Sequence, residues 1–304
     1  MRVLRQLSIL STIILLAAIG TAIAQEDADT TAQTDTLSAW EFGGNVGITF
    51  NQVALSNWSG GGDNTFSVGS SIALFSKFAR GKQTWESNLQ FGYGFTKIKD
   101  EDFRKSDDKL TFLSKYDYNA TRTLLYSFLL DFRTQISEGL NYDVDSLEEP
   151  EKISNFLAPG YLTLSLGATW RPTTYFEAFV APLSNRITIV VDNDLNARGE
   201  FGVDSNKTIK SELGSTARLK FQNEIMENVN LGSTLNLFAP YENFTTVVVT
   251  WSTLLNLKVN DYITTNVSLD VIYDENVDIT RDDGSVGPAT QIKEALNIGF
   301  GYQF

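Results

Sequence analysis

The sequence predicts an all-β protein, a transmembrane antiparallel up-and-down β-barrel of the outer-membrane type with about 12 strands. Three observations lead to this prediction. Apolar and polar residues alternate from about residue 42 to the end, short and long connections alternate between the alternating segments, and the last segment ends in Phe304. Alternation with a period of two is typical of strands whose two faces meet different surroundings.

Each expected strand shows one apolar face and one polar face. In residues 85–95, for example, Trp85, Leu89 and Phe91 fall on one side, and Glu86 and Gln90 on the other. The segment 175–191 is less regular, and we expect a bend at Pro182. The expected strands are 44–50, 66–78, 85–95, 110–118, 124–132, 162–170, 175–191, 213–221, 229–237, 247–257, 263–273 and 296–304.

The lengths of the connections favour a membrane barrel over a soluble sandwich. Short turns on one side, long loops on the other and strands of about 10 residues are typical of outer-membrane barrels, whereas sandwich strands are shorter. An even strand number places both termini at the short-turn end, which is periplasmic in this class. The expected turns are 79–82, 119–123, 171–174, 226–228 and 260–261; the expected loops are 51–64, 97–107, 138–157, 192–209 and 277–290, with a brief 239–243.

Aromatic residues gather at the short-turn ends of the expected strands, as in the interfacial girdle of membrane proteins. The last strand carries Ile298, Phe300, Tyr302 and Phe304 at every second position, which resembles the C-terminal signal of bacterial outer-membrane barrels. We therefore expect the barrel-assembly machinery as a partner. The expected girdle comprises Phe78, Trp85, Tyr116, Tyr118, Trp170, Tyr175, Tyr262 and Phe304.

The N-terminal residues are typical of a secretory signal peptide. Arg2 and Arg5 precede an apolar run that ends at the small-residue site 22–24. We expect cleavage of residues 1–24, a flexible periplasmic leader at 25–41, and a barrel at 42–304. The expected location is the outer membrane of a Gram-negative bacterium, in contact with its lipid and lipopolysaccharide.

The composition excludes several classes of function. The 304 residues include no cysteine and no histidine, so disulfides, thiolate metal sites and catalysis by an imidazole base are absent. A formal charge of −13, which becomes −15 without the two arginines of residues 1–24, argues against nucleic acid as a partner. No catalytic constellation stands out, so we expect neither an enzyme nor a cofactor.

Two motifs in the first third of the mature chain resemble a family. The elements N-W-S-G-G-G-D-N at 57–64 and R-K-S-D-D-K-L at 104–110 are similar to the W-x-x-G-G-x-N and basic-x-D-D elements of a Bacteroidota family of uncharacterised outer-membrane proteins. Here Asp63 is one extra residue before Asn64. The resemblance implies an outer-membrane barrel with no established activity. The motif residues that we single out are Trp58, Gly60, Gly61, Asn64, Lys105, Asp107 and Asp108.

Charged residues of both signs fall on the faces opposite lipid. They suit either a hydrated, selective pore or a polar plug, and the sequence leaves both open. Acidic residues in the expected loops, such as Asp100, Asp192 and Asp283, suggest divalent cations shared with lipopolysaccharide, although no calcium-loop motif is present. The expected lumen charges are Glu86, Asp131, Arg133, Glu212, Arg218, Lys220 and Asp270, with Lys115, Asp117 and Glu177 on the same faces.

The functional hypothesis from the sequence is a narrow pore or transporter for small solutes, gated by surface loops. Two alternatives remain. The barrel could be an anchor for loops with structural or interaction roles, or a partner in outer-membrane assembly or secretion.

Overall fold

A computed structural model describes residues 39–53, 64–99, 101–142, 150–205, 207–260, 262–281 and 285–304. The expected signal peptide and most of the expected leader lie outside the described residues. The elements are β1 (Trp40–Val53), β2 (Thr65–Arg80), β3 (Gln83–Ile98), β4 (Arg104–Asn119), β5 (Leu124–Thr134), β6 (Gly139–Asn141), β7 (Glu151–Ser154), β8 (Gly160–Trp170), β9 (Phe176–Ile189), α2 (Asn193–Ala197), the 3-10 helix η1 (Glu200–Gly202), β10 (Ile209–Met226), β11 (Val229–Pro240), β12 (Val248–Lys258), β13 (Ile263–Tyr273), β14 (Asp278–Thr280), β15 (Val286–Pro288) and β16 (Gln291–Gln303).

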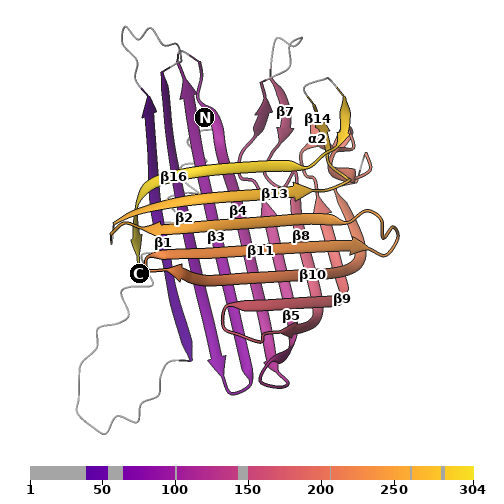
Figure 1. The fold of residues 1–304 in the computed structure, drawn as a ribbon. Helices are drawn as coiled ribbons and strands as arrows, with labels where there is room; N and C mark the ends of the chain where they lie inside the picture. The colour runs from indigo at the N-terminus through magenta and orange to yellow at the C-terminus, as the bar shows by residue number, and fades with distance from the viewer. Residues whose placement is uncertain are drawn as a thin grey trace, which may run out of the picture. The chain divides into compact units, whose positions relative to one another are not determined.

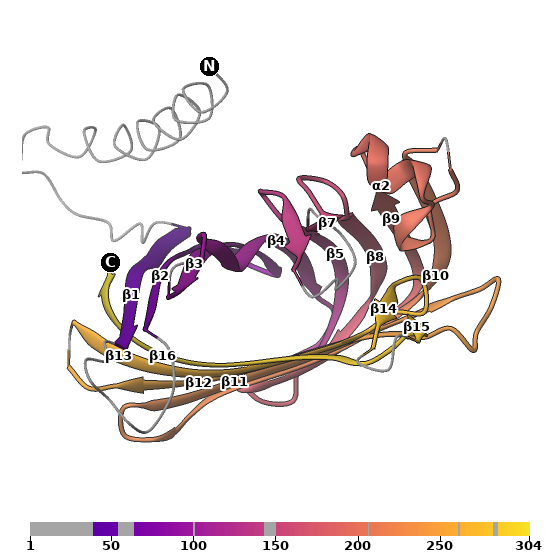
Figure 2. The same ribbon diagram turned by 90° about the horizontal axis from the view of Figure 1, so that it is seen from above.

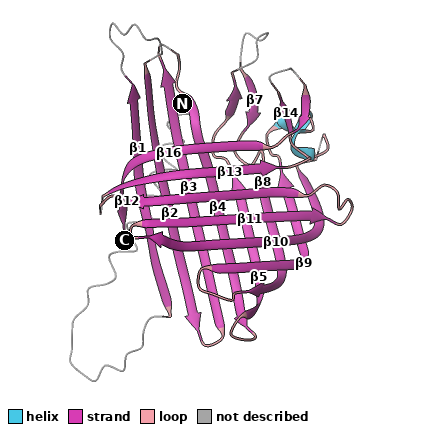
Figure 3. Cartoon of the chain, viewed as in Figure 1, coloured by secondary structure: helices cyan, strands magenta, loops and turns pink. Residues whose placement is uncertain are grey.

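Twelve of these strands form one closed antiparallel barrel in the order β1-β16-β13-β12-β11-β10-β9-β8-β5-β4-β3-β2. Each strand pairs with its neighbour along the chain, so the barrel is up-and-down, as the alternation predicts. The hairpins β6–β7 and β14–β15 lie outside the barrel sheet, inside two of the long loops (Figure 1). Helix is confined in the described chain to the short segments α2 and η1 (Figure 3).

The barrel is flattened rather than round. Seen from above, β11, β12, β13 and β16 form a flat wall that faces the curved wall of the other strands (Figure 2). The strands of the two walls cross at a steep angle (Figure 1). This shape brings side chains from opposite walls close enough to touch.

The connections alternate in length as predicted, with one correction. The expected loop 97–107 is wrong, because β3 continues to Ile98 and β4 begins at Arg104. Only residues 99–103 connect these two strands. The motif residues 104–108 therefore belong to a strand and not to a loop, and a register shift between Gly94 and Phe95 accommodates them.

The strand around Pro182 also has a bulge. β9 is continuous from Phe176 to Ile189, but its pairing shifts against both neighbours, between Leu166 and Ala168 on β8 and between Gly214 and Thr216 on β10. A bulge is a usual way to keep a proline within a sheet. The expected bend is present, and the strand continues through it.

The outer face of the barrel is apolar and exposed. Residues of the expected girdle, among them Trp85, Tyr116 and Trp170, point outward near the short-turn end, and Tyr262 is exposed in the turn before β13. Trp40 joins them, with its ring 5.1 Å from Phe78 and 6.2 Å from Trp85. The first strand begins and the chain ends on this side of the barrel. Trp40 pairs with Phe78 beside the turn at Gly81, and Phe304 is hydrogen-bonded to Gly44.

The register predicts different costs for charge on the two faces of β12. Trp251 points outward beside Leu235, whereas Leu254 points inward beside Gly232. Trp251→Arg should destabilise the barrel in lipid vesicles by roughly 2–4 kcal/mol, because it places the charge against lipid near mid-membrane. Leu254→Arg should cost clearly less. Denaturant unfolding in vesicles measures both, and equal costs would contradict the register.

Candidate functional site

The inner face of the barrel is divided into two unlike halves. The packed half consists of the inward residues of β4, β5, β8, β9 and β10. The glycine-lined half consists of the inward residues of β16, β1, β2 and β3. The inward faces follow from the ladder, because paired residues share a face of the sheet.

The packed half has an apolar centre and hydroxyl groups around it. Leu129, Phe179 and Ala181 form a buried cluster against which Leu113 packs. Buried serine and threonine hydroxyls hydrogen-bond to one another between strands, as in the 2.9 Å bond that the Ser184 hydroxyl donates to Ser165. Side chains therefore fill this half.

Toward the short-turn end, the packed half holds a buried ion cluster. Lys115 on β4 pairs with Glu177 on β9, across β5 and β8. Arg171, in the turn after β8, binds both Glu177 at 2.6 Å and Asp117 at 3.0 Å, and Ser127 donates to Asp117 at 2.6 Å. Each charge has an opposite partner, as burial requires.

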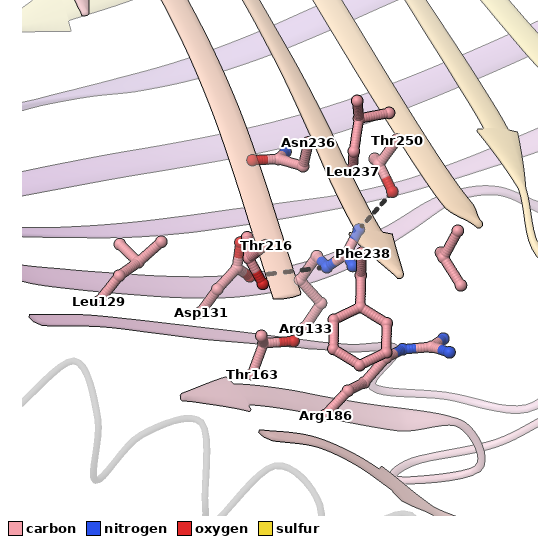
Figure 4. Close-up of a pocket in the computed structure, with 11 residues that line it drawn as sticks. Leu129, Asp131, Arg133, Thr163, Arg186, Thr216, Asn236, Leu237, Phe238 and Thr250 are labelled. Carbon is pink, nitrogen blue, oxygen red and sulfur yellow. Dashed lines mark hydrogen bonds and ion pairs between the residues drawn. The ribbon is translucent and has the colours of Figure 1, made fainter. Parts of the chain in front are cut away.

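A second group of charges lies nearer the long-loop end. Asp131 lies 3.6 Å from both Arg133 and Arg218, and Arg133 donates to the Thr250 hydroxyl on the opposite wall at 3.3 Å. Asp131, Arg133 and Thr250 line a cavity of about 30 Å³ (Figure 4). A volume of this size suits a water molecule and not a solute.

At the long-loop end of the packed half lies what we call the loop cap, residues 150–159, 190–205 and 274–276. It has a core of its own, in which Ala158, Val190, Leu195 and Val203 are buried. Asp274 reaches down to Arg186 on β9 at 2.5 Å. The apolar cluster, the ion pairs and the loop cap thus occupy much of the described part of the packed half.

The glycine-lined half is built from two rows of aligned residues that run across four strands. One row is Gly94, Gly69, Thr49 and Gly299; the next is Gly92, Ser71, Gly47 and Gly301. Six of these eight positions are glycine. Glycine weakens a strand by roughly 0.5–1 kcal/mol relative to alanine. Its repeated use here indicates that another part of the chain approaches the strands closely, or that the lumen beside them is kept free of side chains.

Some of these glycines permit close approach. A Cβ on Gly299 would lie 2.8 Å from the carbonyl oxygen of Ile48, where β16 bends round to pair with β1 (Figure 2). A Cβ on Gly69 would meet only the Thr49 hydroxyl, and one on Gly47 would come within 3.0 Å only of the Ser71 hydroxyl. At Gly69 and Gly47, therefore, only backbone atoms face the lumen.

The inward residues of the glycine-lined half are more accessible to solvent than those of the packed half. Asn45, Ser71 and Gln90 point inward and are exposed, as is the inward Leu254 on the flat wall. The inward Ser127, Ser165 and Thr169 of the packed half are at most 1% exposed. Uncharged polar side chains thus lie beside the glycine rows, while the inward Phe75 and the ion pair of Lys77 with Glu86 are at least partly exposed nearer the short-turn end.

The basic-x-D-D motif is split between the two sides of the wall. Asp107 aligns with Gly94 and points inward, where it reaches Lys293 on β16 at 2.5 Å. Lys105 and Asp108 align with the outward Phe95 and Tyr93. Ser106 is the bulge residue that lets both Lys105 and Asp108 face outward.

Asp108 ties the start of the long connection between β5 and β8 to the outside of β4. Its carboxylate accepts the backbone N–H of Ile136 at 2.8 Å and of Ser137 at 2.9 Å, and Lys105 pairs with it at 2.9 Å. The Lys105 ammonium also donates to the Ser137 carbonyl at 3.0 Å. Asp108 therefore has a structural role in positioning this loop.

The other residues singled out from the sequence lie apart from one another. Trp58, Gly60 and Gly61 are outside the described residues, and Asn64 precedes β2, where its carbonyl accepts the Lys99 N–H. Glu86 lies 4.0 Å from Lys77 on the inner face. The inward Glu212, Lys220 and Asp270 lie on β10 and β13, and the expected assembly residues Ile298, Phe300, Tyr302 and Phe304 lie on the exposed outer face of β16 and at its end.

The sequence reasoning missed Lys293, Arg186 and the aligned glycines. Lys293 continues the polar face of the last strand, two residues before Ala295, so the alternation could have placed it in the lumen. Arg186 lay within the irregular segment 175–191, where the bulge shifts the pattern. The glycine rows depend on pairing between strands, which a single strand does not reveal.

The acidic residues of the loops are largely paired with bases instead of grouped around a cation site. Lys152 binds Asp192 at 3.1 Å and Asp194 at 2.6 Å, and Arg104 binds Glu101 at 2.7 Å. Asp100, Asp282 and Asp283 are outside the described residues. Within the described chain, no group of three acidic, histidine or cysteine side chains is placed to hold a metal ion.

Asp192 makes the loop cap sensitive to acid. It is the N-cap of α2 and accepts the N–H groups of Asp194 and Leu195. Burial raises the pKa of its carboxyl, but hydrogen bonds from Asn155, Leu195 and Lys152 outweigh burial and lower the pKa to about 2. Because the pKa is below its ordinary value of 3.8, this stabilisation is present above about pH 4 and is lost as the pH falls to about 2.

We expect the Leu195 amide to lose hydrogen-exchange protection, corrected for intrinsic rates, between pH 4 and pH 2. Asp192→Asn keeps an oxygen at the cap but cannot ionise, so its protection should be lower at pH 7 and should approach that of the wild type at pH 2. A constant difference between the two proteins from pH 7 to pH 2 would contradict this assignment.

The comparisons with known proteins give a partial family match. The family model described as "Protein of unknown function (DUF3078)" matches residues 50–140, a segment that includes Lys105, Asp107 and Asp108. No curated protein matches the sequence. Of the described residues, none form a helix long and apolar enough to cross a membrane.

Solved structures with some similarity are barrels. The translocator domain of the autotransporter NalP from Neisseria meningitidis is 10% identical, with 97% of this chain and 95% of that chain covered and a TM-score of 0.36. An outer membrane channel from Pseudomonas putida F1 is 11% identical, with 92% and 100% covered and a TM-score of 0.40. Alignments this loose do not carry a function from one barrel to another.

Proposed function

We propose that this protein is an outer-membrane barrel that lets small polar solutes cross through its glycine-lined half. The observation that carries the proposal is the contrast inside the barrel. One half is filled by buried ion pairs and apolar side chains, and the other is lined by glycine, serine and asparagine that remain exposed to solvent.

The outer face supports the location in a membrane. Large apolar side chains stay exposed around the barrel, including Leu166, Leu213, Leu296, Ile298 and Phe300. Such a surface is costly in water but suits lipid, and the closed ladder satisfies the backbone groups that lipid cannot. The aromatic side chains at the short-turn end fit an interfacial girdle, with the termini in the periplasm.

The lining suits passage more than tight binding. Binding pockets enclose a ligand with apolar side chains and a few placed polar groups. The two glycine rows instead present backbone and small hydroxyls, which offer weak and repeated contacts. Weak contacts at several sites are what a conducting path requires.

Catalysis is not part of the proposal. The chain has no histidine or cysteine, and in the described interior the buried carboxylates Asp117, Glu177 and Asp274 are held by arginine or lysine. A carboxylate locked in this way is poorly placed to act as a general acid or base.

Two separate tryptophan substitutions, one facing the lumen and one facing outward, test the path directly. Ser71 points into the lumen between Gly47 and Gly92, and Ser70 is the next residue on the outer face. Ser71→Trp should lower single-channel conductance in planar bilayers to about half or less, because the ring fills space left by the glycines. Ser70→Trp should leave the conductance unchanged.

Equal conductance of Ser71→Trp and the wild type would place the path elsewhere. If neither the wild type nor any variant opens channels, the pore proposal is wrong. The barrel would then be an anchor for the loop cap, whose own apolar core supports an interaction role as the second candidate.

The C-terminal residue gives a test of membrane assembly. The N–H of Phe304 donates to the Gly44 carbonyl at 3.0 Å, and its carbonyl accepts the Gly44 N–H at 3.0 Å. Deletion of Phe304 should lower the outer-membrane yield, because both the closing hydrogen bonds and the terminal ring are lost. Phe304→Ala keeps the backbone bonds, so an intermediate yield is expected, and full yield after deletion would contradict the assignment.

A further inference from the structure

The ion pair between Asp107 and Lys293 crosses the lumen over the glycines of β3. Asp107 is on β4 and Lys293 on β16, and β1, β2 and β3 lie between these two strands in the barrel. Their charged atoms nevertheless meet at 2.5 Å. Both residues lie near the long-loop ends of their strands, so the pair spans the mouth of the glycine-lined half.

The glycines of β3 make room for this contact. A Cβ on Gly92 would lie 2.8 Å from the Asp107 carboxylate, and one on Gly94 would lie 3.5 Å from the Asp107 Cβ. The Asp107 side chain therefore lies along the bare surface of β3 in the direction of β16. The same glycines that line the lumen allow the crossing.

Exposure sets this pair apart from the other ion pairs that cross the described interior. The side chains of Asp107 and Lys293 are 44% and 52% exposed, whereas Arg186 and Asp274 are both 4% exposed. A solvated pair adds little net stability and separates easily. Each partner can therefore exchange its counter-charge for a passing solute without unfolding the barrel.

The charges around the pair are balanced. Lys109 aligns with Gly92 and is exposed, and Asp270 aligns with Lys293 across the ladder. Together with the pair, these residues give two acidic and two basic side chains, and the nearby Arg104 is paired with Glu101. Removing one charge leaves an excess of the other sign where every solute must pass.

We infer that Asp107 and Lys293 form the charge filter of the solute path, an inference that rests on the proposed function. With the pair intact, the mouth carries no net charge and offers a carboxylate and an ammonium side by side. This arrangement favours small solutes that are zwitterionic or uncharged and polar, and disfavours ions of a single sign. A zwitterion can compensate both side chains as it passes between them.

Zero-length carbodiimide coupling tests the contact without any transport. In the folded protein in lipid vesicles, the reagent should join the Asp107 carboxylate and the Lys293 amine through an amide, with loss of water to the reagent. Mass spectrometry should find the joined peptide in the wild type and not in Asp107→Asn. Its absence from the wild type would overturn the inference, whatever the protein conducts.

Reversal potentials in a potassium chloride gradient test the filter. Asp107→Asn should shift the potential toward anion selectivity, and Lys293→Gln should shift it toward cation selectivity, each changing the permeability ratio by about twofold or more. The charge swap Asp107→Lys with Lys293→Asp should restore the wild-type value. Glu294→Gln is the matched control, because Glu294 is next to Lys293 but faces outward, and it should cause no shift.

The outcomes separate the two proposals. Channels with unchanged selectivity in both single variants overturn the filter and leave the pore intact. Absence of conductance in the wild type and in all variants overturns the pore and the filter together, while a positive cross-link then leaves the pair as a structural bridge. Channels that open only when the pair is removed would overturn the filter, because the pair would then close the path instead of selecting solutes.

Discussion

The seam between β1 and β16 is the constraint on which the barrel depends. Antiparallel strands leave no unpaired edge only if the first and last strands meet. This seam has five aligned pairs, from Asn45 with Gln303 to Thr49 with Gly299, whereas β1 and β2 align over fourteen. Closure therefore requires β16 to bend sharply toward β1, and Gly299 permits that bend because a side chain would strike the Ile48 carbonyl.

The same requirement shapes the interior. Gly299 allows the seam to close, and together with Gly47, Gly69, Gly92 and Gly94 it also leaves one side of the lumen without side chains. On the other side, the flattened walls bring bulky and charged residues together, and these must pair because charges buried without partners are costly. The difference between the open and the filled side of the lumen thus follows from the flattened shape of the sheet and from the way it closes.

The motif of basic and acidic residues at the start of β4 places one carboxylate in the lumen and one on the outside of the barrel. Strand alternation turns the neighbouring carboxylates to opposite faces, so Asp107 reaches across the lumen while Asp108 holds the start of the next long loop, and the bulge at Ser106 brings Lys105 to the face of Asp108. Identical side chains next to each other in the sequence thereby act in different surroundings. Both residues lie in the segment that the family model matches, so the two positions can be compared separately in the proteins that this model describes.

The sequence by itself determined the barrel, its twelve strands, the outward aromatic residues and the alternation of turns and loops. Period-two alternation is a local property that every strand carries, which is why 85–95 or 263–273 could be assigned without any partner. Absence of histidine and cysteine likewise excluded whole classes of chemistry directly.

Only the tertiary structure decided which inward residues meet. Lys293 and Asp107 are far apart in the chain, and their contact depends on the register of five strands and on the flattening of the barrel. The glycine rows depend on register as well, because each glycine is an isolated position until neighbouring strands align. Alternation identifies the face of a side chain, but distance across a lumen is set by how the sheet closes, and that is a property of the whole barrel.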